Sequence, residues 1–225
     1  MSATVVVLHG FLGRGSDWDA VRGEGPSEAC WICPDLFAPG AGDLFAVPSF
    51  EGKAWLVGYS FGARLALRWL TAQPERWLGA LLLSVNPGNF QTDPEREARR
   101  QSDRAWAADF RRESWEVLMT QWNSQDIFAG SLHPRRAAED FDREKLAAAL
   151  EKFSVADQFT DIARLSGHFT WLAGGNDVKF CRLLDEMRHT GFPGSFFAVP
   201  DAGHRLLHDA PTAVAAALKR MVSGV

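Results

Sequence analysis

Short apolar runs alternate with helix-like stretches through both ends of the chain. Each run is bounded by glycine, proline or polar residues, which is typical of strands buried inside a sheet. The runs that we expect to form strands are 4–8, 29–33, 54–57, 78–84, 169–173 and 195–199. Helical patterns lie between them, most clearly over 61–73, 179–189 and 211–222. Strands that alternate with helices predict a mostly parallel sheet with right-handed crossovers.

The middle of the chain has a different pattern. Beyond Asp93 the sequence is charged and shows helical periodicity, and no strand-like run occurs until the alternation resumes. Asp93 and Pro94 are a typical cap and first-turn pair for a helix. Aromatic residues supply this segment with apolar packing surface, and they are Trp106, Phe110, Trp115, Trp122, Phe128, Phe141, Phe153 and Phe159. We expect residues 1–86 and 165–225 to form an α/β core, and residues 87–164 to form an inserted helical cap.

One connection in the core is shorter than the alternation requires. Residues 41–53 lie between the second and third expected strands and include Pro48 and Gly52. A full crossover helix does not fit easily there, because proline interrupts a helix and parallel strands usually need a longer connection. The sequence leaves the structure of this segment open.

Composition narrows the class of protein. The 225 residues are 46% hydrophobic, which is enough for one domain with a large core. A net charge of −4 argues against nucleic acid or an anionic membrane as the main partner. No run approaches the roughly eighteen apolar residues of a membrane span, and the first residues do not resemble a signal peptide. We expect a cytoplasmic protein that acts on a small molecule, with a monomer favoured.

The three cysteines do not indicate a disulfide framework. Cys30 and Cys33 form a C-x-x-C pattern, but they lie in a strand-like run where residues three apart face opposite sides. We interpret the pair as part of the core, with a redox role as the alternative. No second pair completes a zinc site, so no metal is expected.

The clearest chemical signal follows the third expected strand. Gly58-Tyr59-Ser60-Phe61-Gly62 has the pattern G-x-S-x-G, with an apolar run before it and a helical pattern after it. This is the sequence context of a nucleophile elbow, in which a serine projects from a sharp turn between strand and helix. The glycines allow strand and helix to approach closely, and the free N–H groups of the helix start favour negative charge beside the serine.

Two further residues complete a candidate relay with Ser60. Asp177 and His204 each follow a late strand, so a parallel sheet would bring both to the edge that carries the serine. A serine hydroxyl needs an imidazole to take its proton, and the imidazole needs a carboxylate to fix its tautomer. Asp201 and Asp157 compete with Asp177. The other histidines compete with His204, but none of them lies in a Gly-His turn after a late strand.

The first expected strand ends at His9-Gly10-Phe11. In esterase-like folds the loop at this place donates the second N–H group of an oxyanion hole. The first N–H group comes from the residue after the nucleophile, which here is Phe61.

These motifs resemble the α/β-hydrolase superfamily, and the resemblance covers most of the chain. More narrowly, Gly58–Arg64, 173–180 and the cap stretch 99–106 are similar to SHCHC synthases of menaquinone biosynthesis. The resemblance implies an α/β-hydrolase fold with a helical cap. It also implies a lyase that removes an α-proton from an enolpyruvyl-succinyl cyclohexene carboxylate and expels pyruvate.

The resemblance further implies how the candidate residues act. The Ser60–His204–Asp177 relay would be the base, without an acyl-enzyme, a metal or a cofactor. The backbone N–H groups of Phe11 and Phe61 would bind the developing oxyanion.

Four further residues are candidates for binding the substrate, which carries several carboxylates. Arg64 lies in the first helical turn after Ser60 and leans toward it, although a cation is unfavourable there and a solvated surface arginine is the alternative. Arg104 belongs to a stripe with Arg96 and Arg100 that is equally consistent with a solvated face. Trp122 is either pocket wall or cap core, and Tyr59 is either a substrate contact or packing at the elbow.

Two departures from the narrower family are visible. A further cap arginine near an Asn-rich stretch has no counterpart here, and Arg135, Arg136 or Arg143 are possible substitutes among which no motif chooses. The passage before Lys53 lacks the family's helix. Three functions stay open on the sequence: the lyase, a serine ester or thioester hydrolase that uses the same relay through an acyl-enzyme, and a noncatalytic binding protein.

Overall fold

The computed structural model describes residues 2–44 and 46–224, and in them one sheet of six parallel strands. Its order is β2-β1-β3-β4-β5-β6, and every neighbouring pair is parallel. The strands are β1 (Thr4–Leu8), β2 (Cys30–Ile32), β3 (Ala54–Tyr59), β4 (Trp77–Leu83), β5 (His168–Gly174) and β6 (Ser195–Val199). The predicted mostly parallel sheet is therefore confirmed, and the strand ends lie close to their predicted positions.

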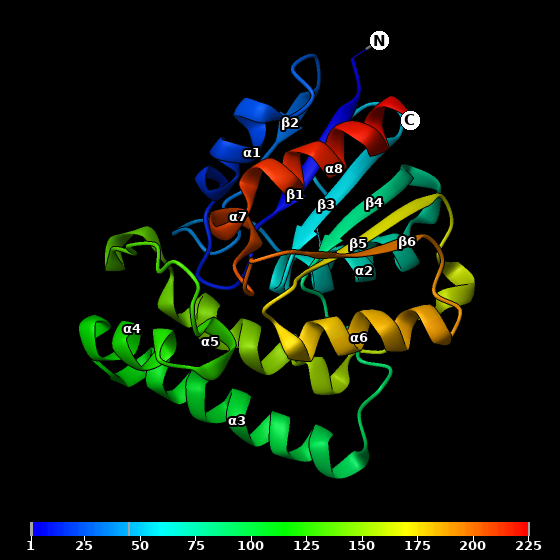
Figure 1. The fold of residues 1–225 in the computed structure, drawn as a ribbon. Coiled ribbons are helices and arrows are strands. Elements are labelled where there is room, and N and C mark those ends of the chain that lie inside the picture. The colour runs from blue at the N-terminus through cyan, green and yellow to red at the C-terminus, as the bar shows by residue number, and fades with distance from the viewer. Residues whose placement is uncertain (1, 45, 225) are drawn as a thin grey trace.

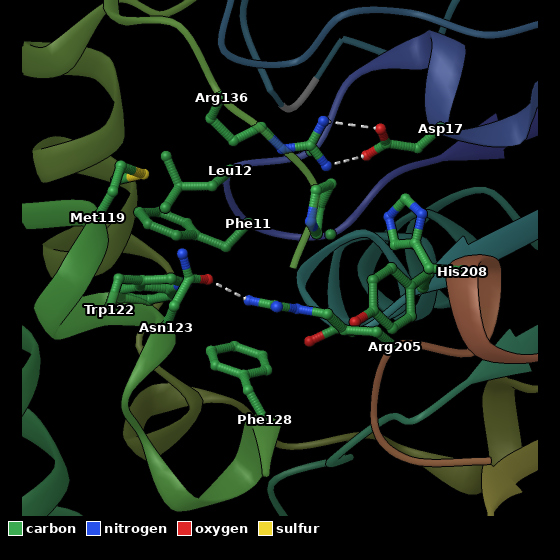
Figure 2. Close-up of a pocket in the computed structure, with 15 residues that line it drawn as sticks. Phe11, Leu12, Asp17, Met119, Trp122, Asn123, Phe128, Arg136, Arg205 and His208 are labelled. Atoms are coloured by element: carbon green, nitrogen blue, oxygen red, sulfur yellow. Dashed lines mark hydrogen bonds and ion pairs between the residues drawn. The ribbon is translucent and has the colours of Figure 1, made fainter. Parts of the chain in front are cut away.

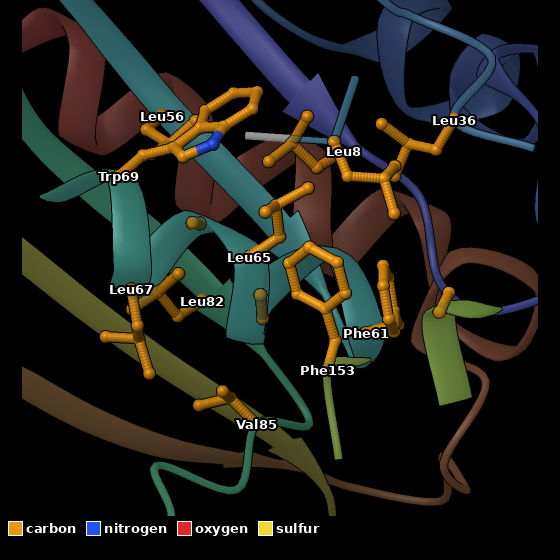
Figure 3. Packing of buried hydrophobic residues seen from close by; sticks show 14 of the residues in the cluster. Leu8, Leu36, Leu56, Phe61, Leu65, Leu67, Trp69, Leu82, Val85 and Phe153 are labelled. Carbon is orange, nitrogen blue, oxygen red and sulfur yellow. The ribbon is translucent and has the colours of Figure 1, made fainter. Parts of the chain in front are cut away.

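Helices cover both faces of the sheet (Figure 1). The first face carries α2 (Phe61–Ala72) and α6 (Val178–His189), and the second carries α1 (Asp19–Glu24), α7 (Leu206–Asp209) and α8 (Pro211–Ser223). The strands alternate between the two cores: in β1, Val6 and Leu8 face the first core, while Val5 and Val7 face the second. Figure 3 shows the first core around α2, where Leu65 and Trp69 point toward β1 and β3.

The connection between β4 and β5 carries the helices α3 (Asp93–Arg112), α4 (Trp115–Asn123) and α5 (Arg143–Lys152). They gather beyond the ends toward which the strands run (Figure 1). The Thr92 side chain accepts a hydrogen bond from the backbone N–H of Glu95, and the Glu95 carboxylate accepts one from the backbone N–H of Thr92. This reciprocal cap explains why α3 begins at Asp93. Most aromatic residues of this segment are buried or half-buried, but Phe159 is 72% exposed and does not serve as packing. The division into core and cap at residues 87 and 164 stays a prediction.

The interpretation of the C-x-x-C pair as core is wrong for Cys30, which is exposed. The reason is that β2 is a short edge strand that pairs only with β1, so one side of it faces solvent. Cys33 is half-buried and lies just beyond β2. None of the three cysteines forms a disulfide.

The connection between β2 and β3 contains no helix in its described residues, which exclude Phe45. Its apolar side chains nevertheless cover the sheet, because Leu36, Phe37 and Leu44 are buried in the first core. Lys145 of α5 fastens this segment by donating to the carbonyl of Ala41 at 2.7 Å and also to that of Gly42. No described helix is long and apolar enough to cross a membrane.

Candidate active site

Ser60 stands alone between β3 and α2 in a strained backbone conformation. Its φ of 51° and ψ of −108° lie outside the regions that non-glycine residues favour, at a cost of about 1–3 kcal/mol. Tight packing enforces this turn. A Cβ on Gly58 would lie 2.5 Å from the Cα of Ala63, and one on Gly62 would lie 2.2 Å from the carbonyl oxygen of Leu8. Both glycines of the motif are therefore required by close contacts of backbone with backbone.

Ser60, His204 and Asp177 form a continuous hydrogen-bonded chain. The Nδ1 of His204 lies 2.7 Å from Oδ2 of Asp177, and its Nε2 lies 3.1 Å from Oγ of Ser60. His204 and Asp177 are both buried. Burial lowers the pKa of His204 more than the Asp177 carboxylate raises it, so the imidazole is neutral at neutral pH. A neutral ring with Nδ1–H toward Asp177 leaves Nε2 free to accept the serine proton.

The competitors of Asp177 and His204 lie outside this chain. Asp201 is exposed in the turn after β6, and Asp157 pairs with Arg100 at 2.8 Å. Asp177 also accepts a hydrogen bond from the N–H of Phe180 at 3.2 Å, which caps α6 and fixes the carboxylate.

His9 holds the loop after β1 next to the serine. Its Nε2 accepts from the N–H of Leu36 at 2.9 Å, so its Nδ1 carries the proton and donates to the carbonyl of Gly10 at 2.8 Å. Burial lowers the pKa of His9 to about 4, which keeps this arrangement intact at neutral pH. Gly10 and Phe11 line a cavity together with Ser60. The binding of an oxyanion by the N–H groups of Phe11 and Phe61 stays a prediction.

A large cavity of about 710 Å³ opens at Ser60 and His204. Its size is typical of a small-molecule site. Its apolar wall includes Phe11, Phe61, Phe90, Trp122, Ile127, Phe128 and Leu150. Four cationic residues line it, Arg64, Arg99, Lys179 and Arg182, against two acidic ones, Glu95 and Glu186. The lining therefore has a positive balance, which favours an anionic ligand.

Arg64 is half-buried and lines this cavity. It donates to the carbonyl oxygen of Phe153, and its guanidinium lies 5.2 Å from the centre of the Phe61 ring. Among the described residues it makes no ion pair. Burial lowers the pKa of Arg64 to about 9, so the group is still charged at neutral pH. The structure thus places a partly desolvated cation, without a carboxylate partner, in the cavity that reaches Ser60.

Arg104 is not brought to either cavity that reaches Ser60. It is exposed on α3, so its interpretation as a substrate contact receives no support. Arg99 lines the large cavity instead, where Asp103 holds its guanidinium through contacts of 2.8 and 2.9 Å. Arg99 and Arg104 are five residues apart, so their side chains point about 140° away from each other around the helix axis. Arg99, Asp103 and Ala107 are spaced four residues apart and therefore lie on one face of α3, and Asp103 and Ala107 are buried. This spacing is the feature of the sequence that could have identified Arg99.

The two aromatic candidates lie at the site in different ways. Tyr59 is buried beneath the loop after β1 and lines a second, smaller cavity. Trp122 lines both cavities and also packs against Phe11 and Trp106, with ring centres 4.9 and 5.0 Å apart. Trp122 is therefore pocket wall and cap core at once.

None of the three alternative cap arginines lines the large cavity. Arg135 is exposed, and Arg143 donates to the carbonyls of Phe110 and Glu113. Arg136 forms a bidentate pair with Asp17 at 2.7 and 2.8 Å beside the small cavity. The described residues contain no group of three or more His, Cys, Asp or Glu side chains placed to hold a metal.

Comparison with known proteins agrees with this architecture. The alpha/beta hydrolase family matches residues 5–217. The 2-succinyl-6-hydroxy-2,4-cyclohexadiene-1-carboxylate synthase of Enterobacter sp. (strain 638) is 32% identical over 97% of this chain and 91% of the relative. The synthase of the same name from Escherichia coli O1:K1 is 30% identical over 97% and 93%.

Solved structures show the same fold. MenH from S. aureus superposes with a TM-score of 0.84 at 18% identity, covering 100% of this chain and 95% of that one. A thermophilic esterase from Thermogutta terrifontis has a TM-score of 0.75 at 19% identity, covering 100% and 90%. The chain belongs to the alpha/beta hydrolase family and is related, at about 30% identity over its full length, to 2-succinyl-6-hydroxy-2,4-cyclohexadiene-1-carboxylate synthases.

Proposed function

We propose that the protein is a lyase that releases pyruvate from an enolpyruvyl-succinyl cyclohexene carboxylate and forms 2-succinyl-6-hydroxy-2,4-cyclohexadiene-1-carboxylate (SHCHC). The C–H bond next to the succinyl ketone breaks, and its electrons move through the ring double bond. The C–O bond to the enolpyruvyl group then breaks, and that group leaves as the enolate of pyruvate. The enolate takes one proton from the relay to become pyruvate, which returns the relay to its starting state. No metal or cofactor takes part, and no acyl-enzyme forms.

The relay supplies the base in this proposal. Ser60 gives its proton to Nε2 of the neutral His204 and takes the substrate proton, while Asp177 stabilises the imidazolium. The ketone oxygen gains negative charge as the C–H bond breaks. The N–H groups of Phe11 and Phe61 are the proposed donors to that oxygen.

The observation that carries the proposal is the unpaired cation beside the relay. Arg64 is half-buried, lacks an ion pair among the described residues and shares the large cavity with Ser60 and His204. Keeping such a charge is costly unless an anion meets it during the reaction. Arg99 lines the same cavity, and arginine forks are suited to carboxylates. Arg99 is already paired with Asp103, but Arg64 has no such partner among the described residues, and a substrate with several carboxylates explains Arg64 whereas a neutral ester does not.

The test is a parallel incubation with the enolpyruvyl precursor and with a neutral aryl ester, in which pyruvate and phenol are measured. We expect pyruvate release from the precursor, reduced about 10²- to 10⁴-fold in Ser60→Ala. Intact-mass measurement during turnover should show no adduct on the unmodified protein. Phenol release with an adduct on Ser60, and no pyruvate release, would instead establish the ester hydrolase.

A further inference from the structure

A second cavity of about 60 Å³ also reaches Ser60 (Figure 2). Tyr59 and the loop after β1 form one part of its wall, and the cap supplies Met119, Trp122, Asn123 and Phe128. One water-sized position needs about 10–15 Å³, so the cavity offers about four to six of them. That space fits a three-carbon acid and excludes a substituted ring. The large cavity is therefore the only one of the two with room for a cyclic substrate.

The charges around the small cavity leave one cation uncompensated. Asp17 and Arg136 neutralise each other as a bidentate pair. Burial lowers the pKa of His208, so its imidazole is neutral at neutral pH. Arg205 is only 6% exposed and makes no ion pair among the described residues. Asp209 attracts it from outside the cavity lining, but its carboxylate oxygens accept from Ser131, Leu132 and Gly203.

Three residues of the segment between β4 and β5 hold the Arg205 guanidinium in place. Its Nη1 donates to the carbonyl of Leu132 and contacts Nδ1 of His133, and its Nη2 donates to Oδ1 of Asn123 at 2.6 Å. The group lies 4.0 Å from the centre of the Phe128 ring (Figure 2). A guanidinium has five N–H donors. The Nε–H and one of the two Nη2–H groups have no acceptor among the described residues.

We propose that the small cavity binds the carboxylate of the departing pyruvate, with the two unused N–H donors of Arg205 as its recognition element. This inference rests on the proposed function, because it assigns the two cavities to the two products of one cleavage. The ring and its succinyl arm occupy the large cavity, and the three-carbon fragment occupies the small one. A carboxylate can accept N–H bonds from two nitrogens of one guanidinium, and Arg205 keeps one unused donor on Nε and one on Nη2.

Direct binding of pyruvate, and of its stable analogue oxamate, tests the assignment in the Ser60→Ala protein by calorimetry. We expect binding that weakens at least tenfold in Arg205→Gln and to a lesser extent in Arg205→Lys, which keeps the charge but loses the fork. The matched control is Arg64→Gln, which changes a cation of the large cavity only and should leave the affinity for pyruvate unchanged.

A second ligand separates recognition from support of the cap, because Arg205 also contacts Asn123, Leu132 and His133. The ring dicarboxylate 2-succinylbenzoate should bind the large cavity of the Ser60→Ala protein equally well with and without the additional substitution Arg205→Gln. Equal weakening of both ligands would make Arg205 a structural tie and overturn the proposal. Undetectable pyruvate binding, or binding that does not depend on Arg205, would overturn it too.

The outcomes also separate this inference from the proposed function. Pyruvate release from the precursor together with Arg205-independent binding refutes the small-cavity site and leaves the lyase standing. Arg205-dependent binding of pyruvate without lyase activity supports the small-acid site and refutes the proposed reaction.

Discussion

At the scale of single residues, the site is defined by charges that lack a counter-ion. Arg64 is half-buried and Arg205 is buried, both donate to backbone carbonyls, and neither makes an ion pair among the described residues. A folded chain keeps desolvated charges of this kind at a cost. They line the two cavities that share Ser60, so in the proposed reaction anionic groups would lie on both sides of the serine.

Truncation of Arg64 should separate anionic from neutral substrates. Arg64→Ala removes a charge-assisted interaction of about 1.5–3 kcal/mol, so kcat/KM for the precursor should fall by roughly one to two orders of magnitude. A neutral aryl ester, if the protein hydrolyses it, should be much less affected. Arg64→Lys should give an intermediate value, because the charge remains without the fork. Full activity of Arg64→Ala on the precursor would contradict a role in binding.

The positions of Ser60, Asp177 and His204 were predictable because each directly follows a strand of a parallel sheet. The sheet alone brings such residues together. Arg99 and Arg205 were not predicted, because their positions depend on how the cap packs. Sequence similarity marked the stretch that contains both Arg99 and Arg104 but not the face of α3 that is buried, so it could not identify Arg99, and a role of Arg104 in binding stays a prediction.

At the scale of elements, the approach of α2 to β1 is what aims the nucleophile. Gly62 permits this approach, because no side-chain atom fits between it and the carbonyl of Leu8. So close a contact between helix and strand can be predicted from the sequence only because Gly62 belongs to the G-x-S-x-G motif. By contrast, β2 looks like a buried strand in sequence, and only its edge position explains why Cys30 is exposed.

A pair of identical substitutions tests the importance of this contact. Gly62→Ala forces backbone apart and should lower the free energy of unfolding by more than about 3 kcal/mol, with loss of activity. A Cβ at Gly23 in α1 would meet no atom within 4 Å, so Gly23→Ala should raise the free energy of unfolding by about 0.5–1 kcal/mol. Urea unfolding of both variants measures the difference. Equal stability of the two would mean that α2 moves freely on the sheet.

At the scale of the whole molecule, buried neutral histidines make stability sensitive to acid. His9 has a pKa of about 4 in the folded protein, against about 6.5 when unfolded. Between these values the unfolded chain binds a proton that the folded chain does not, so stability decreases as the pH falls from about 6.5 toward 4. His204 acts in the same direction, because burial also lowers its pKa.

The contribution of His9 should reach at most about 3.5 kcal/mol below pH 4, because its pKa falls from about 6.5 to about 4 and one pKa unit corresponds to about 1.4 kcal/mol. Urea unfolding at steps from pH 7.5 to 4.5 measures the slope. His9→Asn should flatten the profile over this range while lowering stability at neutral pH, because the bonds to Leu36 and Gly10 are lost. An unchanged slope in His9→Asn would exclude His9 as the source.

The connection between β2 and β3, whose described residues form no helix, has a consequence for slow motion. It covers part of the sheet without the internal hydrogen bonds of a helix, and it is also where α5 is fastened, through Lys145 and through the N–H of Asp142 on the carbonyl of Phe37 at 2.7 Å. Local opening there should release both segments together. Amide hydrogen exchange should therefore find α5 and residues 36–44 protected to the same degree, and less than β3. Independent exchange of the two segments would disprove that coupling.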